Sequence, residues 1–154
     1  MALLQISEPG ESPDPHQLKR AVGIDLGTTH ALIATVRSGV AQCLSDHEGD
    51  VLLPSAVQYH KDFSVSVGRQ VLERRVIDPL NCLVSFKRWM GRGYHDIDRS
   101  TSPYRFMARE GLATIETAAG PKTPVEMSAE VLRTLAQRAE ESLSGELDGA
   151  VITV

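Results

Sequence analysis

The sequence predicts an α/β domain, and three features indicate it. Short apolar runs closed by turn residues, of which Ala21–Leu26 is the first, are typical of buried strands. An amphipathic pattern from Ser128 to Leu143 is typical of a helix. The apolar run Ala150–Val154 follows and predicts a fully buried strand. A helix that leads into a strand is half of a crossover unit, so we expect further residues after Val154.

The composition is that of one globular domain with a substantial core. The chain has 154 residues, 42% hydrophobic and 23% charged, with a formal net charge of -4. The acidic balance argues against nucleic acid and anionic membranes as partners, because these usually require a basic face. No apolar run approaches the roughly 18 residues of a membrane span, and Met1–Ile6 is too short for a signal peptide. We therefore expect a cytoplasmic protein with a flexible tail at residues 1–20.

The first half of the chain is expected to form a meander of three strands and then shorter elements. The expected strands lie at residues 21–26, 31–36, 40–44, 54–59 and 64–67. The meander would place residues 27–29 at the tip of its first hairpin. Two helices are expected at 69–77, with Val71, Leu72 and Val76 on one side, and at 83–90.

The second half is expected to contain a hairpin and the long helix. The hairpin would join residues 104–108 to 112–117 through Glu110 and Gly111. Ser128 is the expected cap of the helix. Its apolar face would consist of Val131, Leu132, Leu135, Ala139 and Leu143. The two cysteines form no C-x-x-C pair and lie in apolar stretches, so buried thiols are expected at Cys43 and Cys82.

The sharpest local signal is the segment Gly23-Ile-Asp-Leu-Gly-Thr-Thr29. Gly27 allows the backbone to turn tightly and approach a ligand closely. The amides at Gly27, Thr28 and Thr29 could then point at phosphate oxygens, and the two hydroxyls add donors. Asp25 could hold Mg²⁺ through water. The pattern alone leaves a plain buried strand with a Gly-Thr turn as an equal alternative.

A basic segment, Phe86–Arg92, is the second signal. A lysine on a short helix, here Lys87, can reach a phosphate as a point charge. The pattern alone leaves a solvated basic face as the main alternative. The neighbouring polar residues His47, Glu48 and Asp50 lack the spacing of a metal site, so they indicate a solvated loop.

Taken in order, these segments resemble the DnaK-type heat-shock protein 70 family. Gly23–Thr29 looks like its first phosphate motif, and Lys87-Arg88-x-x-Gly91-Arg92 resembles its I-K-R-L-I-G-R helix. The segment Glu48-Gly49-Asp50 with Pro54-Ser55 resembles E-G-x-x-x-x-P-S. The likeness covers residues 21–154 and includes Val67-Gly68, Asp78-Pro79-x-Asn81, Pro124–Leu132 and Val151–Val154.

Some residues depart from the family pattern or indicate a branch of it. His30 stands where asparagine is common, and Phe86 and Trp89 replace aliphatic residues while keeping their bulk. Within the family, the chain is similar to the branch that is specialised for iron-sulfur cluster assembly. The segments that carry this likeness are residues 1–10, Leu52-Leu53 and Glu146–Gly149.

The resemblance implies an actin-like (ribonuclease H-like) ATPase fold of two lobes. This chain would be the first part of lobe I, with residues 21–45 and 115–154 in the lower subdomain. Residues 46–114 would form the inserted upper subdomain. The implied activity is that of an ATP-dependent chaperone that assists maturation of iron-sulfur proteins, coupling ATP hydrolysis to binding and release of a client peptide. Its implied partners are an HscB-like J-domain co-chaperone and an iron-sulfur scaffold protein as client.

The resemblance also implies the site residues and the cofactors, ATP and Mg²⁺. Asp25 would position the metal through water, and the terminal phosphates would lie against Gly27, Thr28, Thr29 and His30. Lys87 would be catalytic and would act on the γ-phosphate and the attacking water. The adenosine site would lie beyond Val154, so this chain alone is expected to be inactive.

Two other functions remain open. One is a general DnaK-type chaperone. The other is a different ATPase of the same fold, such as a sugar kinase or an actin-like filament protein. Those proteins share a D-x-G-T-type turn, but they lack the segment around Lys87 at this distance.

Overall fold

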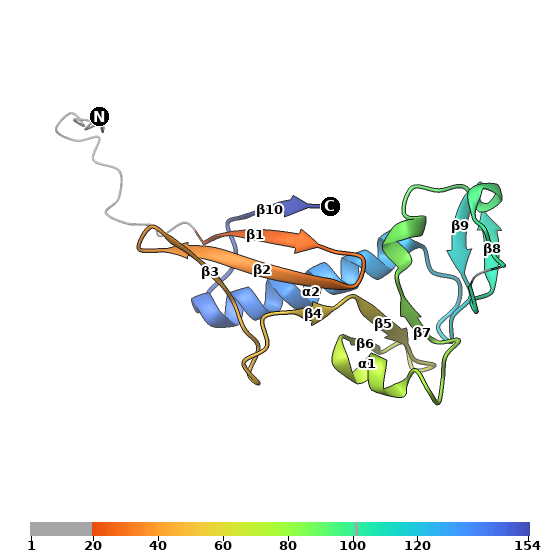
Figure 1. Cartoon of the computed structure of the whole chain (residues 1–154), viewed down its shortest axis with the longest axis horizontal. Coiled ribbons are helices and arrows are strands. Elements are labelled where there is room, and N and C mark those ends of the chain that lie inside the picture. Colours follow the sequence, from red (N-terminus) through yellow and green to blue (C-terminus); the bar gives the residue numbers. More distant parts are fainter. Residues whose placement is uncertain (1–19, 101) are drawn as a thin grey trace.

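The structure, a computed structural model, describes residues 20–100 and 102–154. It consists of one large sheet, one long helix and a group of smaller elements near the start of that helix (Figure 1). The flexible tail expected at residues 1–20 lies, apart from Arg20, outside the described residues. The backbone N–H of Arg20 donates to Asp148 Oδ2 at 2.7 Å. No helix of the described residues is long and apolar enough to cross a membrane.

The large sheet contains strands from both ends of the chain. Its members, in the order β10-β1-β2-β3 with β4 beside β2, are β1 (Ala21–Leu26), β2 (His30–Arg37), β3 (Val40–Cys43), β4 (Leu53–Pro54) and β10 (Gly149–Thr153). β1 runs antiparallel to β2 and parallel to β10, so Asp25 pairs with Leu32 on one side and Thr153 on the other. The predicted meander is confirmed, and residues 27–29 lie at its first tip.

One face of the sheet packs against helix α2 (Pro124–Leu143), which runs behind it in Figure 1. Val22, Ile24 and Leu26 of β1 are buried, whereas the residues that alternate with them are exposed. The buried apolar residues of α2 recur at helical spacing in the same core: Met127, Val131, Leu135 and Ala139. The predicted amphipathic helix is confirmed, and the opposite face of β1, which carries Asp25, is left open.

The helix begins one turn earlier than the sequence predicted. Thr123 is its cap: the Glu126 N–H donates to Thr123 Oγ1 at 3.1 Å, and the Thr123 N–H donates to Glu126 Oε2 at 2.7 Å. This reciprocal capping box and the proline at the first helical position favour the earlier start. Ser128, the predicted cap, is instead buried inside the helix, where its Oγ donates to the Pro124 carbonyl at 2.8 Å.

The smaller elements form two further sheets. The first, in the order β6-β5-β7, consists of β5 (Ala56–Tyr59), β6 (Val65–Val67) and β7 (Cys82–Val84), and the second is the hairpin of β8 (Phe106–Arg109) and β9 (Leu112–Ile115). One helix, α1 (Arg69–Arg74), and two 3-10 turns, η1 (Phe86–Trp89) and η2 (Tyr94–Asp96), connect them. The predicted hairpin is confirmed, with Glu110 and Gly111 at positive φ in its turn.

Two predicted helices in this region differ from the structure. The first ends at Arg74, and only Val71 of its predicted apolar side is buried. The second, predicted at 83–90, is a strand followed by a 3-10 turn. The apolar run around Leu83 pairs with β5, and Ser85, with a φ of 55°, ends the strand and starts η1. Pairing with a distant strand therefore overrides the local pattern.

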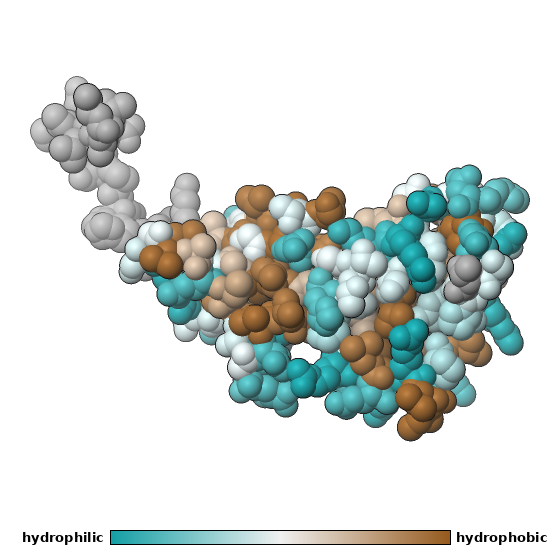
Figure 2. All heavy atoms as spheres, viewed as in Figure 1, coloured by the Kyte–Doolittle hydropathy of each residue, from teal (hydrophilic) through white to brown (hydrophobic). Residues whose placement is uncertain are grey.

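Two predictions of burial are wrong. The strand β10, predicted to be fully buried, lies at the edge of the large sheet, and Val151 is 72% exposed. Figure 2 shows apolar side chains at the surface around this strand, and another apolar group near the loop after α1, where Val76 and Ile77 are exposed. Cys43 is exposed, whereas Cys82 is buried as predicted. Strand β3, which carries Cys43, is exposed along its whole length.

Candidate functional site

The predicted phosphate turn closes the hairpin between β1 and β2. A Cβ added at Gly27 would lie 2.1 Å from the carbonyl oxygen of His30, so only glycine fits this close approach. Thr28, Thr29 and His30 are exposed on the turn, and the chain enters β2 at His30. The turn thus presents hydroxyls and exposed backbone to the surroundings, as a phosphate loop requires.

Lys87 is 61 residues away from this turn in sequence and contacts it in the structure. Its Nζ donates to the carbonyl oxygen of Leu26, the residue before Gly27, at 2.5 Å. The 3-10 turn η1 holds the lysine there, because Phe86 and Trp89 on either side of it are buried. Lys87 therefore does not belong to a merely solvated basic face, which was the main alternative for this segment.

The aromatic side chains behind η1 fix its orientation. Trp89 meets Tyr104 and Phe106 edge to face, with ring centroids 5.8 and 5.0 Å apart. The guanidinium of Arg88 lies 4.7 Å from the Trp89 ring centroid. The two neighbouring cations therefore differ: Lys87 reaches the turn, and Arg88 stacks on an aromatic ring.

Asp25 stands on the open face of the sheet, two residues before Gly27. Its Oδ1 accepts a hydrogen bond from the Thr153 hydroxyl at 3.3 Å, and the residue is exposed. An exposed carboxylate fits Mg²⁺, which keeps most of its waters and binds proteins through one or two carboxylates. Within residues 20–100 and 102–154, no group of three or more histidines, cysteines and acidic residues could hold a metal ion. A metal at this place would rely on Asp25, water and ligand oxygens.

Ser55 contacts the turn from behind, a role that the sequence does not predict. Its Oγ donates to the Gly27 carbonyl at 2.9 Å, and its backbone N–H donates to the Thr29 carbonyl at 2.8 Å. The only signal for it in the sequence is the Pro54-Ser55 pair. The structure thus brings the turn, Lys87 and Ser55 together, with Asp25 on the adjoining strand.

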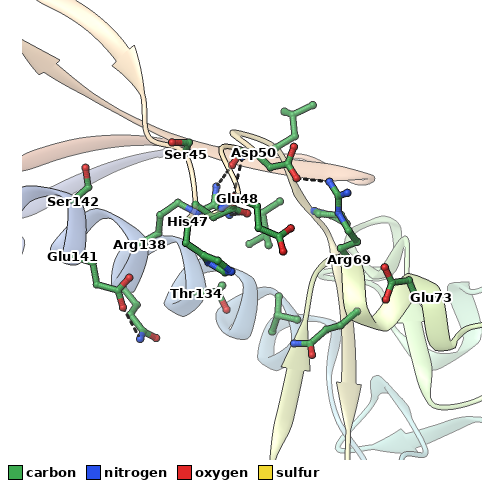
Figure 3. A pocket seen from close by; sticks show the side chains of 17 residues that line it. Ser45, His47, Glu48, Asp50, Arg69, Glu73, Thr134, Arg138, Glu141 and Ser142 are labelled. Carbon is green, nitrogen blue, oxygen red and sulfur yellow. Dashed lines mark hydrogen bonds and ion pairs between the residues drawn. The ribbon is translucent and has the colours of Figure 1, made fainter.

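A separate hollow lies away from this turn. It is a groove of about 730 Å³ between α1, α2 and the loop that joins β3 to β4. Figure 3 shows Arg138 reaching from α2 towards this loop, and Arg69 of α1 paired with Asp50. The loop contains His47 and Glu48, which line the groove with Asp50.

Arg138 ties this loop to the helix. The side chain is 8% exposed, and its guanidinium donates to the carbonyls of Leu44, Asp50 and Val51 at 3.2–3.4 Å. It also pairs with the Asp46 carboxylate at 3.3 Å. The Asp50 N–H lowers the pKa of the Asp46 carboxyl, and the Arg138 charge lowers it further. A lowered carboxyl pKa keeps the ion pair at neutral pH, and the pair is lost only as the pH falls through that pKa.

We expect Arg138→Ala to destabilise the complete nucleotide-binding domain by about 2 kcal/mol, because it leaves the buried Leu44 carbonyl and two partly buried carbonyls without their donor. Urea unfolding would measure the change. Arg133→Ala is the matched control on the same helix, since Arg133 is exposed and pairs only with Glu130 among the described residues. It should cost less than about 0.5 kcal/mol. Equal losses for the two variants would contradict the role given to Arg138.

Comparison with known proteins identifies the family. The model of the family described as Hsp70 protein matches residues 21–154. The chain is 59% identical to the chaperone protein HscA homolog of Methylibium petroleiphilum and 58% identical to that of Azotobacter vinelandii. It is 53% identical to the HscA homolog of Aromatoleum aromaticum. Each alignment covers all of this chain and 25% of the relative, so the chain spans about a quarter of the length of these relatives.

The family match agrees with the mixed α/β architecture described above, and it confirms the resemblance seen in the sequence. The turn at Gly27 and the lysine at 87 both lie within the matched residues. The chain therefore belongs to the Hsp70 family and has its actin-like ATPase fold.

Proposed function

We propose that the chain is the N-terminal part of a cytoplasmic ATP-dependent chaperone of the HscA type, which assists the maturation of iron-sulfur proteins. The observation that carries the nucleotide part of this proposal is the contact between Lys87 and the residue before Gly27. It places a cation beside a glycine turn in a family of ATPases. The HscA names of the relatives support the iron-sulfur part.

The site would bind the phosphates of Mg-ATP at the end of β1. The exposed turn of Gly27, Thr28 and Thr29, with His30 after it, would supply donors to the terminal phosphate oxygens. Asp25 would hold the magnesium ion through water, and the metal would neutralise phosphate charge. These residues bind and orient the phosphate chain.

Lys87 would stabilise the charge that develops on the transferring phosphoryl group. An ammonium group has three donors, and one of them is directed at the Leu26 carbonyl. The remaining donors can reach a γ-phosphate oxygen or the attacking water in the same space. A fixed positive charge at this place lowers the barrier, since it interacts most strongly with the transition state.

We also propose the division into subdomains that the family resemblance implies. Residues 21–45 and 115–154 would form the lower subdomain, and 46–114 the inserted upper subdomain of lobe I. The separation of the large sheet from the two smaller sheets supports this division, except at β4, which lies within 46–114 but pairs with β2 of the large sheet. Lys87 would then approach the turn from the upper subdomain, so the relative placement of the two parts would control hydrolysis.

The iron-sulfur role predicts selective stimulation of the full-length protein. Its ATPase rate should rise with an HscB-like J-domain co-chaperone and with a peptide from an iron-sulfur scaffold protein, because the client would be bound and released during the ATP cycle. Steady-state phosphate release would measure the rates. A general J-domain protein and an unrelated peptide are the matched controls. Equal stimulation by the controls would indicate a general DnaK-type chaperone instead.

A further inference from the structure

Ser55 lies where the chain passes from one sheet to another. The two residues before it form β4 and pair with β2 of the large sheet, while the residues after it form β5 of the second sheet. The sequence predicted one continuous strand over 54–59, and the break falls at this serine. Ser55 is 2% exposed, and both of its donors are directed at the phosphate turn.

These two hydrogen bonds set the orientation of the peptide groups in the turn. In a trans peptide the C=O and the N–H point in opposite directions, and the described chain has no cis peptide. Because the Gly27 carbonyl faces Ser55, the Thr28 N–H faces away from it. The Thr29 carbonyl also faces Ser55, so the His30 N–H faces away in the same manner. Two carbonyl oxygens that would repel a phosphate are thereby kept behind the turn.

Ser55 also links the turn to the segment that carries the lysine. Its neighbour Ala56 pairs with Val84 of β7, three residues before Lys87. Lys87 contacts Leu26, the last residue of β1, and Ser55 contacts Gly27, the next residue. Both contacts are therefore made by the group of smaller elements that includes β5 and β7. The Ser55 hydroxyl and the Lys87 ammonium group are both side-chain donors to backbone carbonyls at this end of β1.

We propose that Ser55 is a positioning residue for phosphate binding: it does not touch the nucleotide, and it orients the amides of Thr28 and His30 outward. This inference rests on the proposed function as an ATPase. It assigns the buried hydroxyl a role in affinity for the outer phosphates, separate from its contribution to the fold.

The test uses the full-length protein and compares Ser55→Ala with Ser128→Ala. Ser128 is a matched control, because it is equally buried and its Oγ also donates to a backbone carbonyl, at 2.8 Å, but within α2. Loss of one neutral hydrogen bond should raise the Kd for Mg-ATP by about 5- to 20-fold in Ser55→Ala. The Kd for AMP, which lacks the outer phosphates, should change less than about 2-fold. Ser128→Ala should leave both constants unchanged.

A conservative variant separates the hydroxyl from the bulk of the side chain. Ser55→Thr keeps the donor and should return the Kd for Mg-ATP to within about 3-fold of the wild type. Ser55→Cys fills the same space with a weak donor, and it should show the ATP-specific loss even where Ser55→Ala fails to fold. Thermal melts with each titration would show which variants are folded.

Three results would overturn the inference. The first is that Ser55→Ala loses affinity for ATP and for AMP equally. The second is that Ser55→Ala binds Mg-ATP as tightly as Ser128→Ala does. The third is that Ser55→Thr binds Mg-ATP as weakly as Ser55→Ala. If the wild type binds and hydrolyses ATP while any of these occurs, only the role of Ser55 is wrong. If the wild type does not bind Mg-ATP, the proposed function is wrong and this inference falls with it.

Discussion

Lys87→Ala in the full-length protein should slow ATP hydrolysis by about 10²–10³-fold while leaving the Kd for ATP within about 3-fold. The lysine is expected to act where charge moves in the transition state, whereas most ground-state affinity would come from the adenosine, the metal and the turn. Its ammonium group already lies at the end of β1, in contact with the Leu26 carbonyl. Single-turnover hydrolysis, with nucleotide binding measured separately, would distinguish the two effects.

Arg88→Ala is the matched control for this experiment. Arg88 is the next residue and carries the same charge, but its guanidinium stacks on Trp89. Its removal should change the hydrolysis rate by less than about 3-fold, since it lies outside the site. An unchanged rate in Lys87→Ala, or an equal loss in both variants, would contradict the catalytic role of Lys87.

The 154-residue polypeptide alone should neither bind nor hydrolyse Mg-ATP. The family resemblance implies a cleft formed by two lobes, and this chain spans about a quarter of the length of its relatives. Phosphate contacts on an open surface give little affinity, because water competes for each hydrogen bond. Calorimetric titration should therefore show no binding at micromolar nucleotide.

The same polypeptide should also fold poorly. The edge strand β10 exposes Val151, at 72%, and Ile152, at 45%. An open strand edge with exposed apolar side chains favours aggregation. A thermal melt should show no cooperative transition, and residues 1–154 should associate in solution. Micromolar binding of Mg-ATP together with a cooperative melt would show that this polypeptide is a competent domain.

The parts of the fold that depend on local signals could be predicted from the sequence. The hairpin of β1 and β2 follows from an apolar run closed by Gly27, and α2 follows from a helical apolar period longer than any strand. The strand β7 could not be predicted, because three apolar residues from Cys82 do not distinguish a strand from a helix. This segment is a strand because it pairs with β5, which lies about 25 residues earlier in the sequence.

The residues of the candidate site also differ in whether a local sequence pattern predicts their role. The turn at Gly27 was visible as a motif, since the chemistry of phosphate binding requires glycine and exposed amides there. The nearness of Lys87 came only from the family resemblance, and the role of Ser55 was not predicted at all. Both depend on hydrogen bonds across the fold, which leave no periodic pattern in the sequence. The exposure of β10 was missed because burial of an edge strand depends on what covers it.

The most direct test of the account is a crystal structure of the complete nucleotide-binding domain with Mg²⁺ and a non-hydrolysable ATP analogue. We expect the terminal phosphates to lie against the turn of Gly27, Thr28 and Thr29, with the metal waters on Asp25. Lys87 Nζ should lie about 3 Å from a γ-phosphate oxygen. Phosphates bound away from this turn, or a Lys87 Nζ that makes no hydrogen bond to a γ-phosphate oxygen, would contradict the proposed site.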